Sequence, residues 1–268
     1  MLEDPARRFT SRAEAYAQYR PHYPPEVLDI LREECGLTAE RVVADIGSGT
    51  GLLAVLFLGH GNQVFGVEPN DAMRQAGEAF LRDYPRFASL PGRAEETGLP
   101  AASVDFIVAG QAFHWFEPER TRPEFVRILQ PDGWLVLVRN RRRPDPGQLG
   151  QAVQELMERC GSRLEVTRRR KSDEAVGAFY GPGGCSLRVC DNRQVLDWPG
   201  LRGLLLSHSS VPEPGQPGHE ELLAGLRRVF EAHQQDGRVT LEYDTTVHFG
   251  RLPGASASGA AAEREGEP

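Results

Sequence analysis

The chain has 268 residues, of which 40% are hydrophobic and 26% are charged, and its formal net charge at pH 7 is −7. A chain of this size can bury a substantial core in one large domain, and its negative charge argues against a general nucleic-acid-binding surface. The first twenty residues lack the apolar core of a signal peptide, and no apolar run reaches the roughly 18 residues of a membrane span. We therefore expect a cytoplasmic protein without a membrane partner.

Cysteines and arginines give no sign of a metal or nucleic-acid site. The four cysteines form no C-x-x-C pair and have no histidines near them at zinc spacing, which is typical of free thiols in a reducing compartment. Two basic runs, RNRRR at residues 139–143 and RRRK at residues 168–171, are interpreted as solvated faces and loops. Short basic runs are weak evidence of a nucleic-acid partner.

Strand-like and helix-like segments alternate between residues 26 and 140. Helices are predicted at residues 25–34, 50–58, 70–82 and 119–129, with Pro25 in a first turn and Asn70 as an N-cap. Strands are predicted at residues 41–46, 64–67, 103–109 and 134–138, with a weak one at 87–90 and a turn at 131–133. This alternation indicates βαβ units and a parallel sheet.

The pattern changes after residue 140. Helices are predicted at residues 148–160, 199–207 and 219–235, and strands at 187–195 and 238–250, whereas residues 163–184 are poorly patterned. Residues 141–200 are expected to form a cap on the substrate side, and ASASGAAAEREGEP at the C-terminus is typical of a disordered tail. The chain is thus divided into an N-terminal segment (1–25), a core (26–140), a C-terminal part (141–250) and a tail (251–268).

A glycine-rich turn follows the first strand of the core, in VADIGSGTGLL at residues 43–53. Glycine reaches positive φ and lets the backbone approach a ligand closely, and turn geometry alone hardly explains all three glycines. A dinucleotide site needs G-x-G-x-x-G or A, but Leu52 occupies the third small position. Asp45 would also face a pyrophosphate at a cost of roughly 1–4 kcal/mol. A cationic ligand that lacks phosphate fits this turn better.

The segment DIGSGTG resembles motif I of the class I S-adenosylmethionine-dependent methyltransferases, in which an acidic residue precedes G-x-G-x-G. The segments GVEPN, GRAEETGLPAASVDFIVAG, FHWF and RILQPDGWLVLV are similar to later blocks of the same family. The resemblance is close over residues 9–140 and looser beyond them. It implies S-adenosyl-L-methionine as the cofactor and an α/β, Rossmann-like fold: a seven-stranded, mostly parallel sheet with one antiparallel strand and helices on both faces. The segment at 238–250 is the candidate for the antiparallel strand.

The resemblance also assigns cofactor-binding positions near the strand ends. It implies that Glu68 accepts hydrogen bonds from both ribose hydroxyls, which suits the two oxygens of a carboxylate. Asp45 would orient the turn or reach the methionine ammonium, unless it only stabilises the turn. Ala94 and Glu95 would hold the adenine edge, unless Glu96 replaces Glu95. Met73 would cover the adenine or belong to the core. The other cofactor candidates are Gly47, Ser48, Gly49, Gly51, Pro69, Asn70, Gly110 and Gln111.

Two further groups of residues are predicted beside the cofactor. The opening FTSRAEAYAQYRPHYP resembles the lid of the ubiquinone/menaquinone-biosynthesis and trans-aconitate-type branch of the family, and a lid would exclude water from the sulfonium. Packing of a helix on the core is the alternative. His114 is a candidate general base, with a structural role as the alternative. The residues implied near the acceptor are Tyr16, Tyr19, Arg20, Tyr23 and Trp115.

The sequence therefore predicts an S-adenosylmethionine-dependent methyltransferase that transfers a methyl group to a small-molecule acceptor by in-line displacement. In many family members this reaction needs no dedicated base, because it depends on near-attack geometry. Two alternatives stay open: an NAD-dependent oxidoreductase, and a protein that binds the cofactor without catalysis. The sequence does not identify the acceptor or the atom that is methylated.

Overall fold

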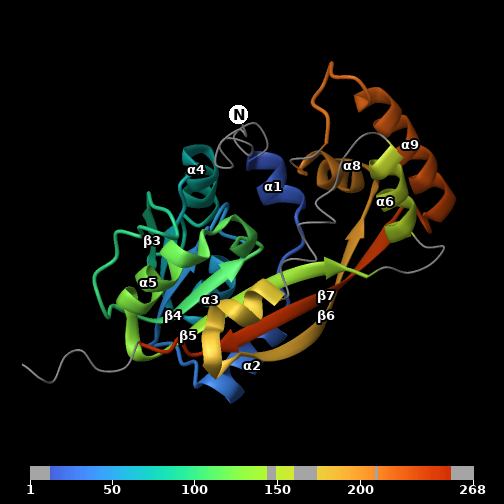
Figure 1. The fold of residues 1–268 in the computed structure, drawn as a ribbon. Coiled ribbons are helices and arrows are strands. Elements are labelled where there is room, and N and C mark those ends of the chain that lie inside the picture. The colour runs from blue at the N-terminus through green and yellow to red at the C-terminus, as the bar shows by residue number, and fades with distance from the viewer. Residues whose placement is uncertain (1–12, 144–148, 160–173, 209–210, 255–268) are drawn as a thin grey trace, which may run out of the picture.

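The computed structural model describes residues 13–143, 149–159, 174–208 and 211–254. Their centre is a seven-stranded sheet in the order β3-β2-β1-β4-β5-β7-β6 (Figure 1). The strands of the first half are β1 (Val42–Ile46), β2 (Gln63–Val67), β3 (Phe87–Leu90), β4 (Val104–Gly110) and β5 (Leu129–Arg142). All four pairings among these five strands are parallel. The predicted parallel core is therefore confirmed.

The last two strands complete the sheet at one edge. They are β6 (Ser186–Leu196) and β7 (Val239–Gly250), and β7 pairs in antiparallel fashion with both β5 and β6. Because β6 is antiparallel to β7, it runs in the same direction as the first five strands. β7 is thus the one reversed strand, as predicted for residues 238–250.

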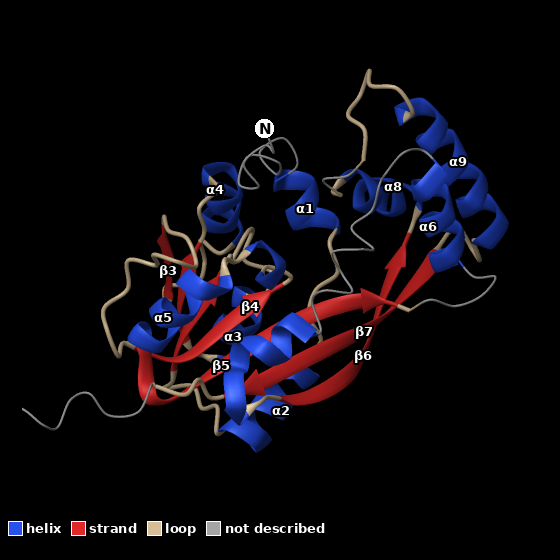
Figure 2. Cartoon of the chain, viewed as in Figure 1, coloured by secondary structure: helices blue, strands red, loops and turns tan. Residues whose placement is uncertain are grey.

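Helices cover both faces of the sheet (Figure 2). On one face, α2 (Glu26–Cys35) and α3 (Ala54–His60) pack apolar side chains such as Leu31 and Phe57 on the strands. On the other face, α5 (Pro118–Ile128) and the helical residues 174–180 bring Phe125 and Tyr180 into a second cluster. Burial of these two layers supplies the main stabilisation of the core, because it removes apolar surface from water.

Three helices form a separate cluster at the far end of β6 and β7 (Figure 1). They are α6 (Leu149–Arg159), α8 (Trp198–Leu206) and α9 (His219–His233), and the strand residues Leu241 and Tyr243 pack among them. This helical cluster differs from the expected cap at 141–200, because residues 186–196 belong to the sheet. Burial along β7 alternates over residues 239–243, whose buried side chains pack in the cluster, and is continuous over residues 245–250.

Two predicted boundaries are corrected by the structure. The turn expected at residues 131–133 is an irregularity within β5, where Leu129 pairs with Val104 and Trp134 with Phe106. The predicted tail begins too early, because Leu252 is buried in the core. Residues 255–268, the rest of the tail, lie outside the described part of the chain.

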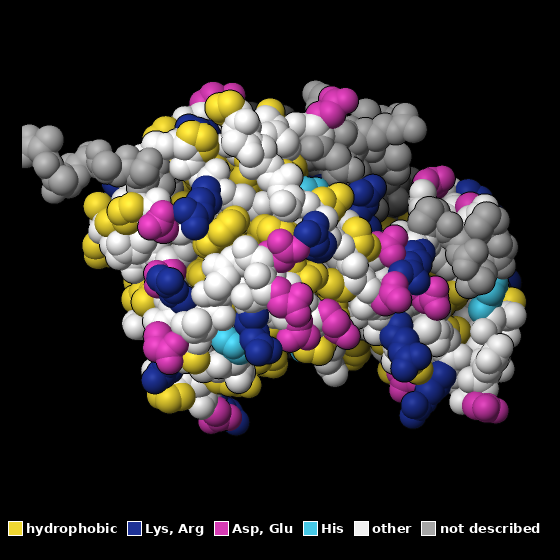
Figure 3. Space-filling model, turned by 90° about the horizontal axis from the view of Figure 1, so that it is seen from below, with side chains coloured by type: hydrophobic (Ala, Val, Ile, Leu, Met, Phe, Trp, Pro, Cys, Tyr) yellow, Lys and Arg dark blue, Asp and Glu magenta, His cyan; other side chains and the backbone are white. Residues whose placement is uncertain are grey.

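The first arginine run is structured rather than loop-like. Residues 139–142 continue β5 and pair with residues 243–246 of β7. Arg143 donates to Asp244 at 2.6 Å and also bonds Asp191. The second run, at residues 168–171, lies outside the described residues. On the face that Figure 3 shows, acidic and basic side chains are interspersed rather than gathered by sign.

A search of the described helices finds none with the length and apolar character that a membrane span requires.

α3 begins later than the sequence predicts, because the glycine turn extends further along the chain. Gly47, Gly49 and Gly51 have φ values of 68°, 56° and 83°. A right-handed helix cannot include such a residue, so α3 starts at Ala54 instead of residue 50. The positive φ values favour glycine at all three positions, so turn geometry accounts for more of the glycines than the sequence analysis expected.

Leu81, which follows α4 (Asp71–Phe80), fixes the position of this turn. A Cβ on Gly51 would lie 2.5 Å from Cδ1 of Leu81, whose side chain is buried. The turn thus has little room to move on the side of the helices.

We expect Gly51→Ala to lower the free energy of unfolding by about 1–3 kcal/mol, because it adds backbone strain and a clash with Leu81. Urea unfolding followed by circular dichroism measures the change. Gly59→Ala is the control: Gly59 lies in α3 with nothing within 4 Å of its Cβ position. The control should gain about 0.5–1 kcal/mol from helix propensity. Equal effects of the two substitutions would contradict the account of the turn.

Candidate functional site

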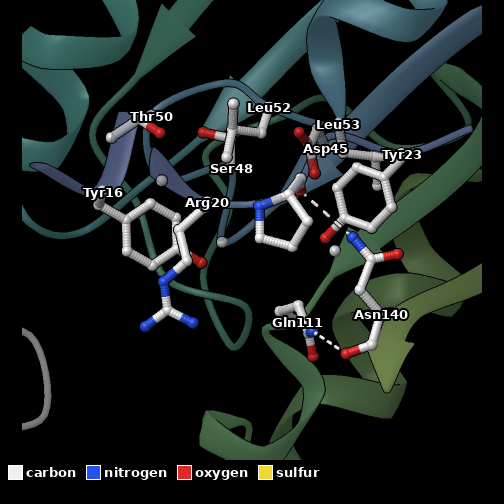
Figure 4. Close-up of a pocket in the computed structure, with 14 residues that line it drawn as sticks. Tyr16, Arg20, Tyr23, Asp45, Ser48, Thr50, Leu52, Leu53, Gln111 and Asn140 are labelled. Carbon is white, nitrogen blue, oxygen red and sulfur yellow. Dashed lines mark hydrogen bonds between the residues drawn. The ribbon is translucent and has the colours of Figure 1, made fainter. Parts of the chain in front are cut away.

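A pocket lies at the carboxyl ends of the central strands, at the point where the order of strands in the sheet reverses. β1 leads outward to β2 and β3, whereas β4 lies on the other side of β1, and ligands bind parallel α/β sheets at such a switch point. The pocket holds about 470 Å³ of empty space, including its open mouth. The glycine turn, the ends of β1, β4 and β5, and residues 16–23 surround it (Figure 4).

Asp45 is the most unusual group in this pocket. It is 1% exposed, and neither carboxylate oxygen has a hydrogen-bond partner among the described residues. Burial, and secondarily the charge of Glu68, raise the pKa of the Asp45 carboxyl to about 7, and the nearby backbone N–H of Ala54 offsets only part of the rise. A buried carboxylate without a partner is costly. This site therefore favours a cation.

Glu68 stands at the end of β2 and holds the glycine turn in place. Its two oxygens accept hydrogen bonds from the backbone N–H of Gly49 at 2.9 Å and of Asn70 at 2.8 Å. Burial raises the pKa of Glu68, and these two bonds offset part of the rise. Each carboxylate oxygen can accept a further bond, so the structural role leaves capacity for ribose hydroxyls.

Asn70 is confirmed as the N-cap of the helix that follows, α4. Its side-chain oxygen accepts from the backbone N–H of Met73 at 2.9 Å. The Cε atom of Met73 lies 3.3 Å from the Cβ position of Gly49, so Met73 packs against the glycine turn. Pro69 connects Glu68 to this cap. The group ties the ends of β1 and β2 together.

Gln111, directly after β4, and Asn140, near the end of β5, line the pocket (Figure 4). Gln111 has a positive φ of 56°, and its Nε2 donates to the backbone oxygen of Asn140 at 2.7 Å. Asn140 donates in turn to the carbonyls of Pro21 and His22 at 3.2 and 3.3 Å, and it accepts from Thr245 at 2.6 Å. Strained residues that are held by such bonds cluster at functional sites.

The sequence analysis missed Asn140. It comes two residues after the end of the predicted strand 134–138, just as Gln111 comes two residues after the end of the predicted strand 103–109. Asn140 was overlooked because it lies within the arginine run at residues 139–143. The other lining residues that were not predicted are Pro21, Thr50, Leu52 and Leu53.

The N-terminal segment covers the pocket with three of its four predicted residues. Tyr16, Arg20 and Tyr23 line the cavity, from α1 (Ala13–Tyr19) and the linker that follows it. The Tyr23 hydroxyl lies 2.6 Å from the Cβ position of Gly110, which explains glycine at the end of β4. Burial raises the pKa of Tyr23 well above its usual range, so this hydroxyl keeps its proton. Tyr19 instead packs against Gly203 of α8.

Nine other candidates are not among the residues that line the pocket: Gly51, Glu68, Pro69, Asn70, Met73, Ala94, Glu95, His114 and Trp115. The carboxylate of Glu95 accepts from the backbone N–H of Glu117 at 2.9 Å and from the hydroxyl of Thr121 at 3.1 Å, at the start of α5. His114 is exposed on the short helix η2 (Phe113–Trp115), 4.7 Å between ring centroids from Trp115. Ala94 is buried and Met73 packs as described above. Their assigned roles stay predictions.

The residues that line the pocket include one cationic and one acidic side chain. Arg20 is the cationic side chain among the lining residues; its guanidinium lies 4.8 Å from the centroid of the Tyr16 ring and donates to the carbonyl of Ser207 at 3.1 Å. Asp45 supplies the negative charge at the glycine turn (Figure 4). A ligand that carries both an ammonium and a carboxylate would complement the two groups.

Comparisons with known proteins find methyltransferases similar to this chain. Residues 44–137 match the model of the family described as "Methyltransferase domain". A relative from Mycobacterium tuberculosis, named an uncharacterized methyltransferase, is 40% identical over 153 residues, which are 56% of this chain and 60% of the relative. An uncharacterized methyltransferase of Schizosaccharomyces pombe is 28% identical over 86% of this chain and 91% of the relative. The match thus spans about 60% of the length of the mycobacterial relative.

Solved structures share the fold. One, of a proposed type II methyltransferase from Anaeromyxobacter dehalogenans, has a TM-score of 0.66 at 24% identity and covers 87% of this chain and 98% of its own. Another, of a proposed methyltransferase from Anabaena variabilis, has a TM-score of 0.59 at 21% identity and covers 88% of this chain and 99% of its own.

The sheet order and the pocket at its switch point define a Rossmann-like α/β protein. Over residues 44–137 the chain is thus similar to the methyltransferase domain family, and it shares its fold with the solved methyltransferase structures. The narrower resemblance to the ubiquinone/menaquinone and trans-aconitate-type branch stays a prediction.

We expect Asp45→Asn to raise the free energy of unfolding at pH 8 by about 2–4 kcal/mol. An unfolded Asp loses its proton near about pH 4, but in the folded chain Asp45 loses it near pH 7. The folded state therefore binds the extra proton between these values, and wild-type stability falls as the pH rises through this window.

Urea unfolding of both proteins between pH 4 and 8 tests this expectation. The two stabilities should converge at the acidic end and separate toward pH 8. Asp83→Asn, which changes an exposed carboxylate, serves as the control and should follow the wild type throughout. Parallel curves for the wild type and Asp45→Asn would contradict a raised pKa.

Proposed function

We propose that this chain is a cytoplasmic S-adenosylmethionine-dependent methyltransferase that acts on a small-molecule acceptor. The observation that carries the proposal is the buried Asp45 carboxylate, which has no partner of its own and lines the pocket. Such a group fits the ammonium of the cofactor and opposes the phosphates of a dinucleotide.

The residues present fit the cofactor in three respects. Asp45 and Arg20 would hold the ammonium and carboxylate of its methionine part. Glu68 retains acceptor capacity for the ribose hydroxyls beyond its bonds to Gly49 and Asn70. The backbone of the glycine turn lines the same pocket. When bound, the cofactor supplies an activated methyl group on a cationic sulfur.

The remaining residues of the pocket orient the reactants and exclude water. Tyr16 and Tyr23 cover the cavity with aromatic surface, and Tyr23 presents a hydroxyl that stays protonated. Gln111 is fixed by its bond to Asn140 and presents its amide oxygen as an acceptor. Holding two reactants in line lowers the entropic part of the barrier, and a dry pocket protects the sulfonium. His114, exposed and outside the lining, is not assigned a proton-transfer step.

The alternatives differ in measurable ways. An NAD-dependent oxidoreductase would place a pyrophosphate against the glycine turn, but Leu52 lines the pocket at the third small position and Asp45 is buried beside it. A protein that binds the cofactor without catalysis would share every feature of the cofactor side. The protein is incubated with radiolabelled S-adenosylmethionine and a metabolite extract. This experiment distinguishes a methyltransferase from a protein that only binds the cofactor, because only an enzyme yields a labelled product.

We expect Asp45→Asn to bind S-adenosylhomocysteine at least tenfold more weakly than the wild type at pH 8, measured by isothermal titration calorimetry. The neutral amide loses the attraction for the ammonium although the variant is the more stable protein. A fall in affinity together with a rise in stability therefore identifies a binding group and not a folding defect.

Asp83→Asn is the matched control and should bind S-adenosylhomocysteine as the wild type does. NADH is titrated in parallel as the competing ligand. Unchanged affinity of Asp45→Asn for S-adenosylhomocysteine, or tighter binding of NADH than of S-adenosylhomocysteine by the wild type, would overturn the proposed function.

A further inference from the structure

β6 is the outermost strand of the sheet, next to β7 only (Figure 1). All eleven of its residues are in register with β7, from Ser186 to Leu196. An edge strand directs half of its backbone N–H and C=O groups away from its partner, where another strand can pair with them. Its length makes β6 a much better template than β3, the four-residue strand at the opposite edge.

One face of β6 carries exposed apolar side chains. Leu187, Val189 and Val195 are 47%, 56% and 52% exposed, and their odd numbering places them on the same face. Natural edge strands usually carry charges that prevent pairing, and three large apolar side chains on one edge strand depart from that pattern. A partner strand would remove this apolar surface from water.

Two charges of opposite sign lie between the valines on the same face. Asp191 and Arg193 are both exposed. Asp191 bonds Arg143, whereas Glu242, which lies opposite Arg193 on β7, is shared with Arg143 at 3.6 Å. Arg143 is thus the ion-pair partner of Asp191 and Glu242, the carboxylates nearest Arg193. The Arg193 guanidinium is therefore available to a partner.

We propose that β6 pairs with β6 of a second copy of this chain, in antiparallel fashion, about a two-fold axis through Asn192. This symmetry places Val189 opposite Val195 of the second copy and Asp191 opposite Arg193 of the second copy, each twice. Directly opposed apolar and oppositely charged side chains stabilise an antiparallel pair. The product is a continuous fourteen-stranded sheet.

The neighbouring registers lack this match. An axis through Asp191 would oppose the two copies of that carboxylate, and an axis through Arg193 would oppose two guanidinium groups. A two-fold axis perpendicular to the sheet keeps each face on its own side, so only registers centred on a residue are available. The sequence of the exposed face is therefore self-complementary in one register.

The proposed axis lies beside the pocket wall. Asn192 donates to the carbonyl of His22 at 2.8 Å and to Oδ1 of Asn140 at 3.2 Å. His22 belongs to the linker that carries Arg20 and Tyr23. Pairing of the β6 strands would therefore fix the strand that supports this linker.

Sedimentation velocity of the full chain from 1 to 100 μM tests the proposal. The wild type should show a concentration-dependent dimer, and Val189→Lys should raise its dissociation constant at least tenfold. The matched control is Phe80→Lys, which changes a side chain that is 40% exposed on α4 and should leave the dimer unchanged. Circular dichroism confirms that each variant is folded.

A charge exchange tests the register itself. Asp191→Arg and Arg193→Asp should each weaken the dimer by opposing like charges, and the double variant should recover most of the loss. A wild-type chain that stays monomeric at 100 μM, equal effects of Val189→Lys and Phe80→Lys, or a double variant no stronger than either single one would overturn the proposal.

Discussion

The buried carboxylate of Asp45 is the constraint on which the pocket depends. It occupies the end of the central strand, where the backbone, Glu68 and the covering tyrosines leave it almost no water and no hydrogen bond. No arginine or lysine of the described residues neutralises this charge, and the nearby backbone N–H of Ala54 offsets only part of the cost of burial. Uptake of a proton or binding of a cation would remove this cost. A folded core that keeps such a group is organised around its ligand rather than around its own stability.

The surrounding structure is rigid where Asp45 needs support. Three glycines with positive φ shape the turn, Glu68 holds its middle, and Leu81 blocks its movement toward the helices. Each of these contacts has a structural purpose that does not involve a ligand. These contacts order the pocket without a ligand, so a ligand that binds there would spend little binding energy on ordering it.

The sequence predicted the parallel core well because β1, β2 and β4 are mostly buried and each ends at, or is followed by, a glycine or a charged residue. Strand β7 was also predicted, since its alternation is regular. The start of α3 was wrong, because a positive φ at Gly51 is a property of backbone conformation that hydrophobic periodicity does not register. Asn140 was missed for a similar reason: its role arises from bonds to residues 21, 22 and 245, which are far from it in the chain.

The side-chain amide of Asn192 joins two parts of the molecule that the chain separates by 170 residues. It bonds the carbonyl of His22, next to the tyrosine that covers the cofactor pocket, from a strand at the outer margin of the sheet. A displacement of that margin by more than the length of one hydrogen bond must break this contact or draw the linker with it. Events at the rim of the sheet and the width of the pocket mouth are in this way mechanically linked.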